Sequence, residues 1–250
     1  MTSHKQSLGI IGVGAFGAFM LPHLAPHFDV TVYDTQDVSA LAHKHGAAVG
    51  DLAQVAKSDI VVLAVPVQRL EAVLIALAPQ VKPDALVIDV ASVKLKPMDL
   101  MQQHLPASVS IVGTHPLFGP QSGKDGIAGL NLAVCEGRGG RAPCVAAFLR
   151  DVLKLHVIET TAEDHDRQMA YVQGLTHLLG KVIAALNLPE FQLTTRTYDL
   201  MDQMVGMIRY DSDELFKAIE RENPFTTEAK RAFFTAARQL EEALGEPIRK

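Results

Sequence analysis

The chain has 250 residues, 48% of them hydrophobic, and a formal net charge of −5 at pH 7. This length allows a sizeable core and two domains. The negative net charge does not indicate binding to nucleic acid or to an anionic membrane surface. The two cysteines, Cys135 and Cys144, are too few for a disulfide framework and lack metal-site spacing. We therefore expect free thiols, no bound metal, and neither nucleic acid nor membrane as a partner.

No targeting or membrane-spanning segment is expected. Residues 1–7 are polar and lack the apolar centre of a secretory signal, and no run of eighteen apolar residues follows. The most apolar long segment, residues 172–188, is interrupted by His177 and Lys181, which indicates a buried helix. These features predict a soluble, cytoplasmic protein.

The first elements follow the order strand, glycine loop, helix, strand, acidic residue. A short apolar run at residues 8–11 ends at Gly12-Val13-Gly14-Ala15-Phe16-Gly17. A helix-competent stretch covers residues 15–24, and residues 29–33 alternate β-branched and aromatic side chains up to Asp34. This order favours a dinucleotide-binding unit over a simple tight turn.

Each glycine of the loop has a physical role in that interpretation. Gly12 permits the tight turn, Gly14 lets the backbone approach a pyrophosphate, and Gly17 lets helix and strand pack closely. The helix that follows offers N–H groups and a partial positive charge to the phosphates. We expect the whole loop, including Ala15 and Phe16, to bind the cofactor.

Asp34 predicts which dinucleotide is bound. Its carboxylate can accept hydrogen bonds from the adenosine ribose hydroxyls, and it would repel a 2′-phosphate. No arginine or lysine occurs between Asp34 and His43 to bind such a phosphate. The sequence therefore favours NAD over NADP.

The pattern continues as alternating strands and helices. The almost continuous apolar run at residues 59–65 is typical of a parallel strand buried on both faces, and it ends at Pro66. Residues 69–77 have helical periodicity, and residues 85–88 and 110–112 are further expected strands. This alternation predicts a Rossmann-type, doubly wound, mostly parallel sheet.

The segment 113–123 contains three glycines and two prolines, which predicts a loop after the strand at residues 110–112. His115 would lie where the strand ends, and Pro116 would hold its backbone extended. Alone, this stretch could be a structural turn with a partly exposed histidine. However, Gly12, Pro66, Ser92 and His115 all follow strand ends, and ligands of such sheets gather at the carboxyl edge. We expect these residues to converge on one crevice.

The second part of the chain is expected to be helical. A strand at residues 130–135, a helix at 143–154 and a strand at 156–159 would complete a dinucleotide-binding domain of residues 1–160. Residues 161–250 would form a helical domain for substrate binding and dimerisation, with helices at 165–187, 191–209, 212–221 and 226–244. A compact monomeric cap is the alternative. The apolar residues that favour a homodimer are Met169, Leu175, Leu178, Leu179, Met201, Met204 and Met207.

Several motifs together resemble prephenate dehydrogenase, in particular the dehydrogenase half of the bifunctional chorismate mutase–prephenate dehydrogenases. The resemblance covers about residues 8–204, and its specific part is Ala-Ser-Val-Lys followed by His-Pro-x-Phe-Gly-Pro. The motifs are the glycine loop, Val65-Pro66, Asp89-Val90-Ala91-Ser92-Val93-Lys94, His115-Pro116-Leu117-Phe118-Gly119-Pro120, Glu163-Asp164-His165-Asp166, and the stretch 169–177.

The resemblance implies oxidative decarboxylation of prephenate, or of its amino counterpart arogenate, with hydride transfer to NAD in tyrosine biosynthesis. His115 would match the catalytic histidine, which accepts the proton of the ring hydroxyl, and Ser92 would orient His115 or the substrate. Lys94 and His177 would line the substrate crevice; their structural alternatives are an exposed lysine at a helix start and a core histidine. Val65 and Pro66 would contact the cofactor, and His165 is interpreted as a structural residue.

One position departs from the family pattern. Related enzymes carry a carboxylate-binding arginine after a Met-Val-Gly sequence, but Met207 stands there in this chain. Arg196, about three turns earlier, is the candidate replacement, and a solvated surface charge is the alternative. Two other hypotheses therefore stay open: an NAD-dependent oxidoreductase acting on a related cyclohexadienyl acid, and a non-catalytic NAD-binding sensor.

Overall fold

The computed structural model describes residues 5–209 and 211–245 and divides the chain into two compact units. The first unit ends at His165 and the second begins at Asp166, a few residues after the predicted boundary at 160/161. Residues 1–4, the start of the polar segment considered above, lie outside the described part.

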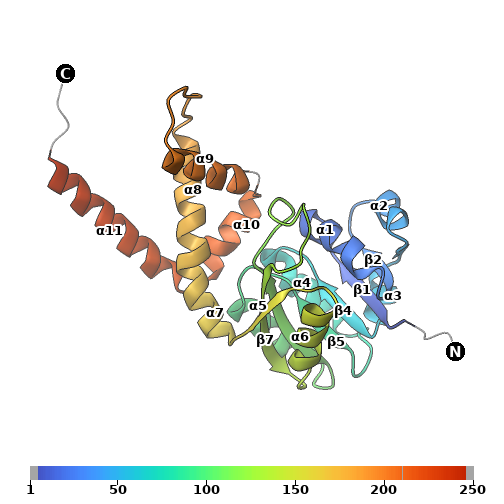
Figure 1. Ribbon diagram of the computed structural model, residues 1–250. Helices are drawn as coiled ribbons and strands as arrows, with labels where there is room; N and C mark the ends of the chain where they lie inside the picture. Colours follow the sequence, from blue (N-terminus) through green and yellow to red (C-terminus); the bar gives the residue numbers. More distant parts are fainter. Residues whose placement is uncertain (1–4, 210, 246–250) are drawn as a thin grey trace. The chain divides into compact units, whose positions relative to one another are not determined.

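The first unit is built on an eight-stranded sheet in the order β3-β2-β1-β4-β5-β6-β7-β8 (Figure 1). All neighbouring strands are parallel except β6 and β7. The order starts in the middle and grows outward in both directions, which confirms the predicted doubly wound, Rossmann-type sheet. The strands are β1 (Ser7–Ile11), β2 (Asp29–Tyr33), β3 (Ala48–Val49), β4 (Ile60–Leu63), β5 (Leu86–Asp89), β6 (Ser110–Pro116), β7 (Asn131–Arg138) and β8 (His156–Glu159).

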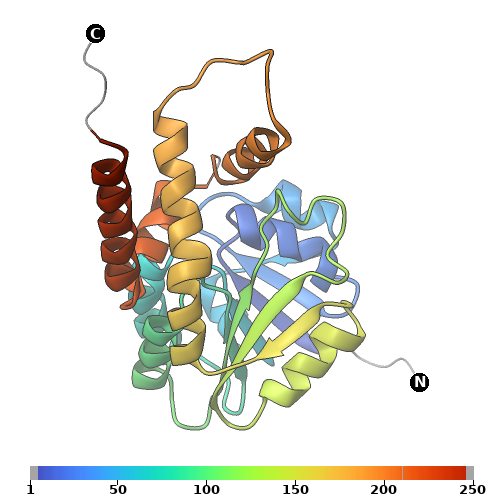
Figure 2. The ribbon, with the colours of Figure 1, turned by 60° about the vertical axis from the view of Figure 1, so that its left-hand side comes forward.

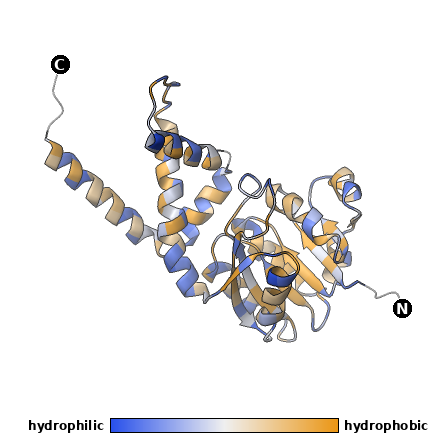
Figure 3. Ribbon diagram, viewed as in Figure 1, coloured by the Kyte–Doolittle hydropathy of each residue, from blue (hydrophilic) through white to orange (hydrophobic). Residues whose placement is uncertain are grey.

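Alternating side chains of the strands enter separate apolar clusters. Ile11 and Leu63 pack with the apolar faces of α3, α4 and α5, while Ile10 and Val62 pack with those of α1 and α2. Figure 3 shows the hydrophobic colour along these strands. Burying each large aliphatic side chain contributes about 1.5–3 kcal/mol before entropy is counted. The helices are α1 (Ala15–Leu24), α2 (Ser39–Lys44), α3 (Leu52–Ala56), α4 (Val67–Leu77), α5 (Leu95–His104) and α6 (Ala142–Asp151).

Strand β6 corrects one prediction. It does not end at Val112 but continues through His115 to Pro116, so His115 lies inside the strand and not in a loop. The reason is non-local: the neighbouring strand β7 is antiparallel to β6 and pairs His115 with Ala133 and Pro116 with Leu132. The Gly-Thr-His-Pro stretch has little strand tendency of its own, and its extended form depends on this partner.

The second unit is helical throughout its described residues, as predicted, but its helix limits differ. The expected helix at 165–187 is an uninterrupted helical run from Ala162 to Ala185 with a π-helical segment in its middle (Figure 1). The expected helix at 191–209 begins only at Arg196, because the Thr195 side chain accepts a hydrogen bond from Tyr198 N and caps it there. The elements are α7 (Ala162–Met169), η1 (Ala170–Leu175), α8 (Thr176–Ala185), α9 (Arg196–Ile208), α10 (Asp213–Lys217), η2 (Ala218–Glu222) and α11 (Thr226–Leu244).

Within this unit, α11 packs against η1 (Figure 2), and α9 packs against α8 (Figure 1). Gly180 lies against Ile208, where an added Cβ would be 2.9 Å from the isoleucine Cδ1. Among the described residues, no helix has the length and apolar character needed to cross a membrane.

Candidate active site

The glycine loop between β1 and α1 requires glycine at two positions for steric reasons. Gly12 has a φ of +95°, and a Cβ there would lie 2.5 Å from the Ala64 carbonyl oxygen. A Cβ at Gly17 would lie 2.2 Å from the Gly12 carbonyl oxygen. These contacts let β1, the loop and α1 approach closely, as the fingerprint predicts.

Gly14 differs from these two glycines because it faces open space. A Cβ at Gly14 would meet no atom within 4 Å, and the residue is exposed. Gly14 is also the N-cap of α1, where no side chain caps the helix. The first N–H groups of α1 are therefore suited to bind an anion such as a pyrophosphate.

Asp34 connects this loop to the end of β2. Its Oδ2 accepts a hydrogen bond of 2.6 Å from Val13 N, and its Oδ1 accepts one of 2.9 Å from Gln36 N. The carboxylate thus holds the loop in place, and it is half-buried, so part of it faces solvent. Each carboxylate oxygen has two lone pairs, which leaves acceptor capacity for ribose hydroxyls.

The other predicted cofactor residues surround the same loop. Val65 follows β4 and is half-buried; its Cγ1 would lie 2.9 Å from a Cβ placed on Gly12. Pro66 is exposed and is the N-cap of α4. Ala15 is exposed and Phe16 half-buried at the start of α1. The open space at Gly14 and the uncapped start of α1 are compatible with a bound pyrophosphate.

A buried polar cluster joins the end of β5 to β6. The Lys94 ammonium donates to Asp89 Oδ2 and, at 2.6 Å, to the Thr114 carbonyl oxygen. Asp89 Oδ2 also accepts from Ala91 N at 2.9 Å, and Thr114 Oγ1 donates to the Asp89 carbonyl oxygen at 2.7 Å. The cluster fixes the backbone on both sides of Ser92 and next to His115.

Burial governs the electrostatics of this cluster. Lys94 and Asp89 are 0% and 1% exposed. Desolvation raises the pKa of the Asp89 carboxyl, and the charge of Lys94 acts in the opposite direction. The alternative interpretation of Lys94 as an exposed lysine is therefore wrong. Its ammonium supports the strand that carries His115, and a role in substrate binding stays a prediction.

His115 is buried, with 4% of its surface exposed, which argues against the alternative of a partly exposed turn residue. Its Nδ1 lies 2.8 Å from Nε2 of His165, which is 2% exposed. The two rings have centroids 5.0 Å apart and are inclined at 70°. Ser92, predicted to orient His115, is half-buried, and in the described structure the ring contact at Nδ1 comes from His165.

Sequence reasoning did not identify His165 as a partner of His115. The expectation that site residues follow the carboxyl ends of parallel strands could not locate it. Strand β8 is antiparallel to β6, and the chain leaves the sheet after β8 to begin α7. The only signal was its place in the Glu-Asp-His-Asp motif, which was assigned to helix initiation.

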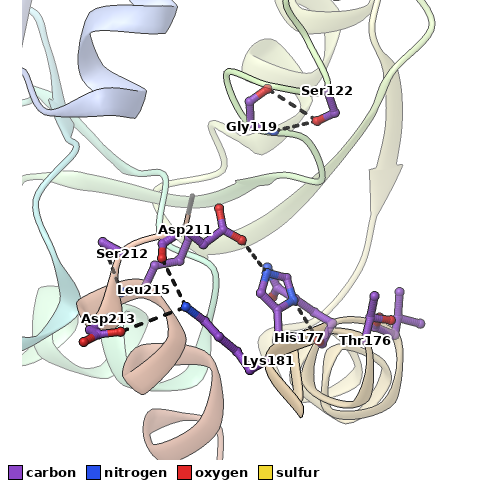
Figure 4. Close-up of polar contacts among 11 residues, drawn as sticks. Gly119, Ser122, Thr176, His177, Lys181, Asp211, Ser212, Asp213 and Leu215 are labelled. Carbon is purple, nitrogen blue, oxygen red and sulfur yellow. Dashed lines mark hydrogen bonds and ion pairs between the residues drawn. The ribbon is translucent and has the colours of Figure 1, made fainter. Parts of the chain in front are cut away.

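His177, predicted to bind substrate, belongs to the helical unit, where it lies in a polar cluster (Figure 4). Its Nε2 is 3.0 Å from Asp211 Oδ2, and its Nδ1 is 2.9 Å from the Gln173 carbonyl oxygen. Both partners of the ring are oxygen atoms that act as acceptors. Lys181 Nζ is 3.5 Å from the Asp211 carbonyl oxygen. Figure 4 also shows the contacts between Gly119 and Ser122 in the loop after β6.

Arg196 is the first residue of α9 and is exposed. Met207, at the position where the resemblance predicts an arginine, is 51% exposed on the same helix. Met207 lies eleven positions after Arg196, which is about three whole turns, so the two side chains lie on nearly the same side of α9. A role for Arg196 in binding a carboxylate stays a prediction.

The family profile described as "Prephenate dehydrogenase, nucleotide-binding domain" matches residues 20–130. Arogenate dehydrogenase 2 of Arabidopsis thaliana is 30% identical over 234 residues, covering 89% of this chain and 65% of the relative. Cyclohexadienyl dehydrogenase of Zymomonas mobilis is 32% identical over 195 residues, covering 72% of this chain and 66% of the relative. The chain is thus similar, over most of its length, to members of the prephenate and arogenate dehydrogenase family.

The residues that match the nucleotide-binding profile lie in the first unit, and the glycine loop lies just before them. The chain spans between about two fifths and two thirds of the length of the first curated relatives, including 39% of arogenate dehydrogenase 1 of Arabidopsis thaliana.

Solved structures share the fold of this chain at low sequence identity. Prephenate dehydrogenase from Aquifex aeolicus, in complex with hydroxyphenyl propionate and NAD+, has a TM-score of 0.77 at 18% identity, covering 98% of this chain and 92% of that one. Synechocystis arogenate dehydrogenase has a TM-score of 0.72 at 19% identity, covering 95% and 91%.

Proposed function

We propose that this protein is an NAD-dependent dehydrogenase that oxidatively decarboxylates prephenate or arogenate in tyrosine biosynthesis. The observation that carries the proposal is His115, a buried imidazole at the carboxyl end of β6 in a nucleotide-binding sheet. The names of the curated relatives, arogenate dehydrogenase and cyclohexadienyl dehydrogenase, support this reaction class.

In the proposed reaction, His115 is the general base. Its imidazole accepts the proton of the hydroxyl on the ring carbon from which hydride departs, and loss of the ring carboxylate as CO₂ makes the ring aromatic. Bound NAD supplies the hydride acceptor. Histidine suits this role because its ordinary pKa of about 6.5 lies near working pH, and the His115 side chain is buried.

For the cofactor, we propose that the pyrophosphate binds at the N-terminus of α1 and that Asp34 binds the adenosine ribose. The open space at Gly14, the uncapped helix start and the partly exposed carboxylate support this arrangement. Val65 and Pro66 border the loop on the side of β4 and complete the proposed cofactor site.

For the substrate, we propose that Ser92, Lys94, His177 and Arg196 contribute to the site. Arogenate differs from prephenate by an amine in place of the side-chain ketone, and both carry carboxylates, one of which the missing arginine would bind. Because Met207 cannot neutralise a carboxylate, a related cyclohexadienyl acid is the second candidate substrate. NADH formation with prephenate and with arogenate separates the candidates, and turnover of a related acid alone would favour the second.

We also propose that the protein is a homodimer through its helical unit. Most of the large hydrophobic side chains that are exposed on the described residues belong to this unit, including Val172 at 63%, Leu186 at 62% and Leu240 at 61%. Large exposed apolar areas are typical of association surfaces. Sedimentation equilibrium of the full chain tests this, and a monomer at micromolar concentration contradicts it.

The catalytic proposal is tested with His115→Asn. We expect turnover to fall at least about a hundredfold, since general-base catalysis is typically worth 10²–10⁴-fold, with NAD affinity nearly unchanged. His43→Asn, at an exposed position of α2, is the matched control and should behave as the unmodified protein. An unaffected rate in His115→Asn would remove His115 from the mechanism. A folded, NAD-binding protein with no turnover of any of these acids would instead indicate a non-catalytic sensor.

A further inference from the structure

We infer that His165 is a positioning residue that fixes the tautomer of His115 so that its Nε2 can accept a proton. This inference deepens the proposed function and rests on it for its catalytic part. The geometry behind it is the 2.8 Å contact between His115 Nδ1 and His165 Nε2, made by two rings that are each less than 5% exposed. No residue of the predicted site other than His115 takes part in this contact.

The contact permits two arrangements of the shared hydrogen when both rings are neutral. A neutral imidazole carries one N–H, and its other nitrogen is an acceptor. If His115 Nδ1 carries the hydrogen, it donates to His165 Nε2, and His115 Nε2 is then the acceptor. If His165 Nε2 carries the hydrogen, His115 must carry its own at Nε2 and cannot accept another there. Only the first arrangement leaves His115 a base at Nε2.

His165 can hold this arrangement because its own position is fixed independently of His115. The Thr161 hydroxyl accepts a hydrogen bond of 3.0 Å from Asp164 N, and the Thr161 carbonyl accepts one of 2.9 Å from His165 N. These bonds set the first turn of α7. His115 is fixed by its pairing with Ala133 in the sheet. The two rings therefore meet with little freedom, which favours a single donor and a single acceptor.

The contact also stabilises the proton once His115 has accepted it. The imidazolium of His115 has an N–H at both nitrogens, so Nδ1–H continues to donate to His165 Nε2 and no ring has to turn. The charged groups around the pair are Asp89, whose carboxylate interacts electrostatically with His165, and Lys94, which is paired with Asp89. Asp166 follows His165 on α7. All three are retained in the variants below.

The test compares His165→Leu with His165→Gln. Leucine fills the space but has no acceptor, whereas the glutamine amide can place an oxygen near the position of Nε2. We expect His165→Leu to lower kcat at least about tenfold, with small effects on KM and NAD affinity, and to displace the acid limb of the pH–rate profile. His165→Gln should recover most of the rate, because it restores the acceptor. Equal losses in both variants, or no loss in His165→Leu, would overturn the inference.

A second measurement does not depend on activity. Nitrogen-15 NMR of the histidine-labelled protein, with the His115 signals assigned through His115→Asn, reports which ring nitrogen carries the hydrogen. We expect His115 to be the Nδ1–H tautomer in the unmodified protein and in His165→Gln, and to lose this preference in His165→Leu. An Nε2–H tautomer in the unmodified protein refutes the inference even if turnover is normal. The Nδ1–H tautomer in a protein without turnover would refute the proposed function and support this contact.

Discussion

The buried pair of Lys94 and Asp89 allows a stability prediction whose size follows from the structure. In Lys94→Met, a side chain of similar length fills the space, and Asp89 keeps one hydrogen bond, from Ala91 N, but loses its countercharge. Its Oδ1 already has no hydrogen-bond partner among the described residues. Removing one partner of a buried ion pair costs about 3–5 kcal/mol, since the remaining charge is left uncompensated.

This cost should appear as a large change in the unfolding of the first unit. For a chain of this size, about 1 kcal/mol corresponds to about 2–4 °C in the melting temperature, so we expect a decrease of about 6–20 °C. The pKa of Asp89 is already raised by burial, and without Lys94 its protonated form becomes the tolerated one. A carboxyl group with a raised folded-state pKa favours the folded state at low pH and loses this contribution as pH rises. The deficit of Lys94→Met should therefore be larger at pH 8 than at pH 5.

The assay is calorimetric and denaturant unfolding of three variants at both pH values. The double variant Lys94→Met/Asp89→Asn keeps an acceptor for Ala91 N but carries no buried charge, so it should recover more than half of the lost stability. Lys57→Met, at an exposed position after α3, should stay within about 0.5 kcal/mol of the unmodified protein. If Lys94→Met is as harmless as Lys57→Met, or if the double variant is no more stable than the single one, the reasoning from buried charge is wrong.

Three further predictions concern the first unit. Gly14→Ala should change the free energy of unfolding by less than about 0.5 kcal/mol but weaken NAD binding measured by calorimetry. In Gly17→Ala, the added Cβ would lie 2.2 Å from a backbone oxygen and should cost about 1–3 kcal/mol or more of stability. Equal stability of the two variants would contradict the steric argument. Asp34→Ala should reduce the preference for NAD over NADP in steady-state kinetics, and a preference for NADP in the unmodified protein would refute the role of Asp34. The Lys82 and Ser7 hydrogen bonds lower the pKa of Asp59 to about 2 from an ordinary value of 3.8, so its stabilisation is present above pH 3.8 and is lost as pH falls toward 2. Because the pair is partly exposed, we expect Asp59→Asn to cost about 1 kcal/mol at pH 6 and almost nothing at pH 2 in acid-titrated unfolding.

The sheet could be predicted because its signals are local. The glycine loop, the apolar run that ends before Pro66 and the acidic residue at the end of β2 each depend on a few neighbouring residues. These signals locate the first strands and helices along the chain without knowledge of any distant contact. The late start of α9 was missed for the opposite reason, since the apolar side chains at Phe191 and Leu193 resemble a helix face while Thr195 sets the actual start.

The place of His115 near the carboxyl end of a sheet strand could be predicted, but its surroundings could not. Its burial results from pairing with β7 and from contact with α7, and both lie far away in the sequence. Lys94 was expected in a crevice because its motif resembles the family's, but its partners are an aspartate and a backbone carbonyl. Which side chains meet in a dry interior depends on long-range packing, and one sequence carries no direct signal of it.

The π-helical segment η1 has a consequence for the helix that follows it. Two carbonyls of η1 accept side-chain contacts from the turn that follows. Thr176 Oγ1 donates to the Val172 carbonyl at 2.6 Å, and the His177 ring contacts the Gln173 carbonyl. The backbone thus acts as a clamp on the imidazole. Deleting one residue from η1 would close the turn, rotate α8 by about 100° relative to Met169, and release that clamp.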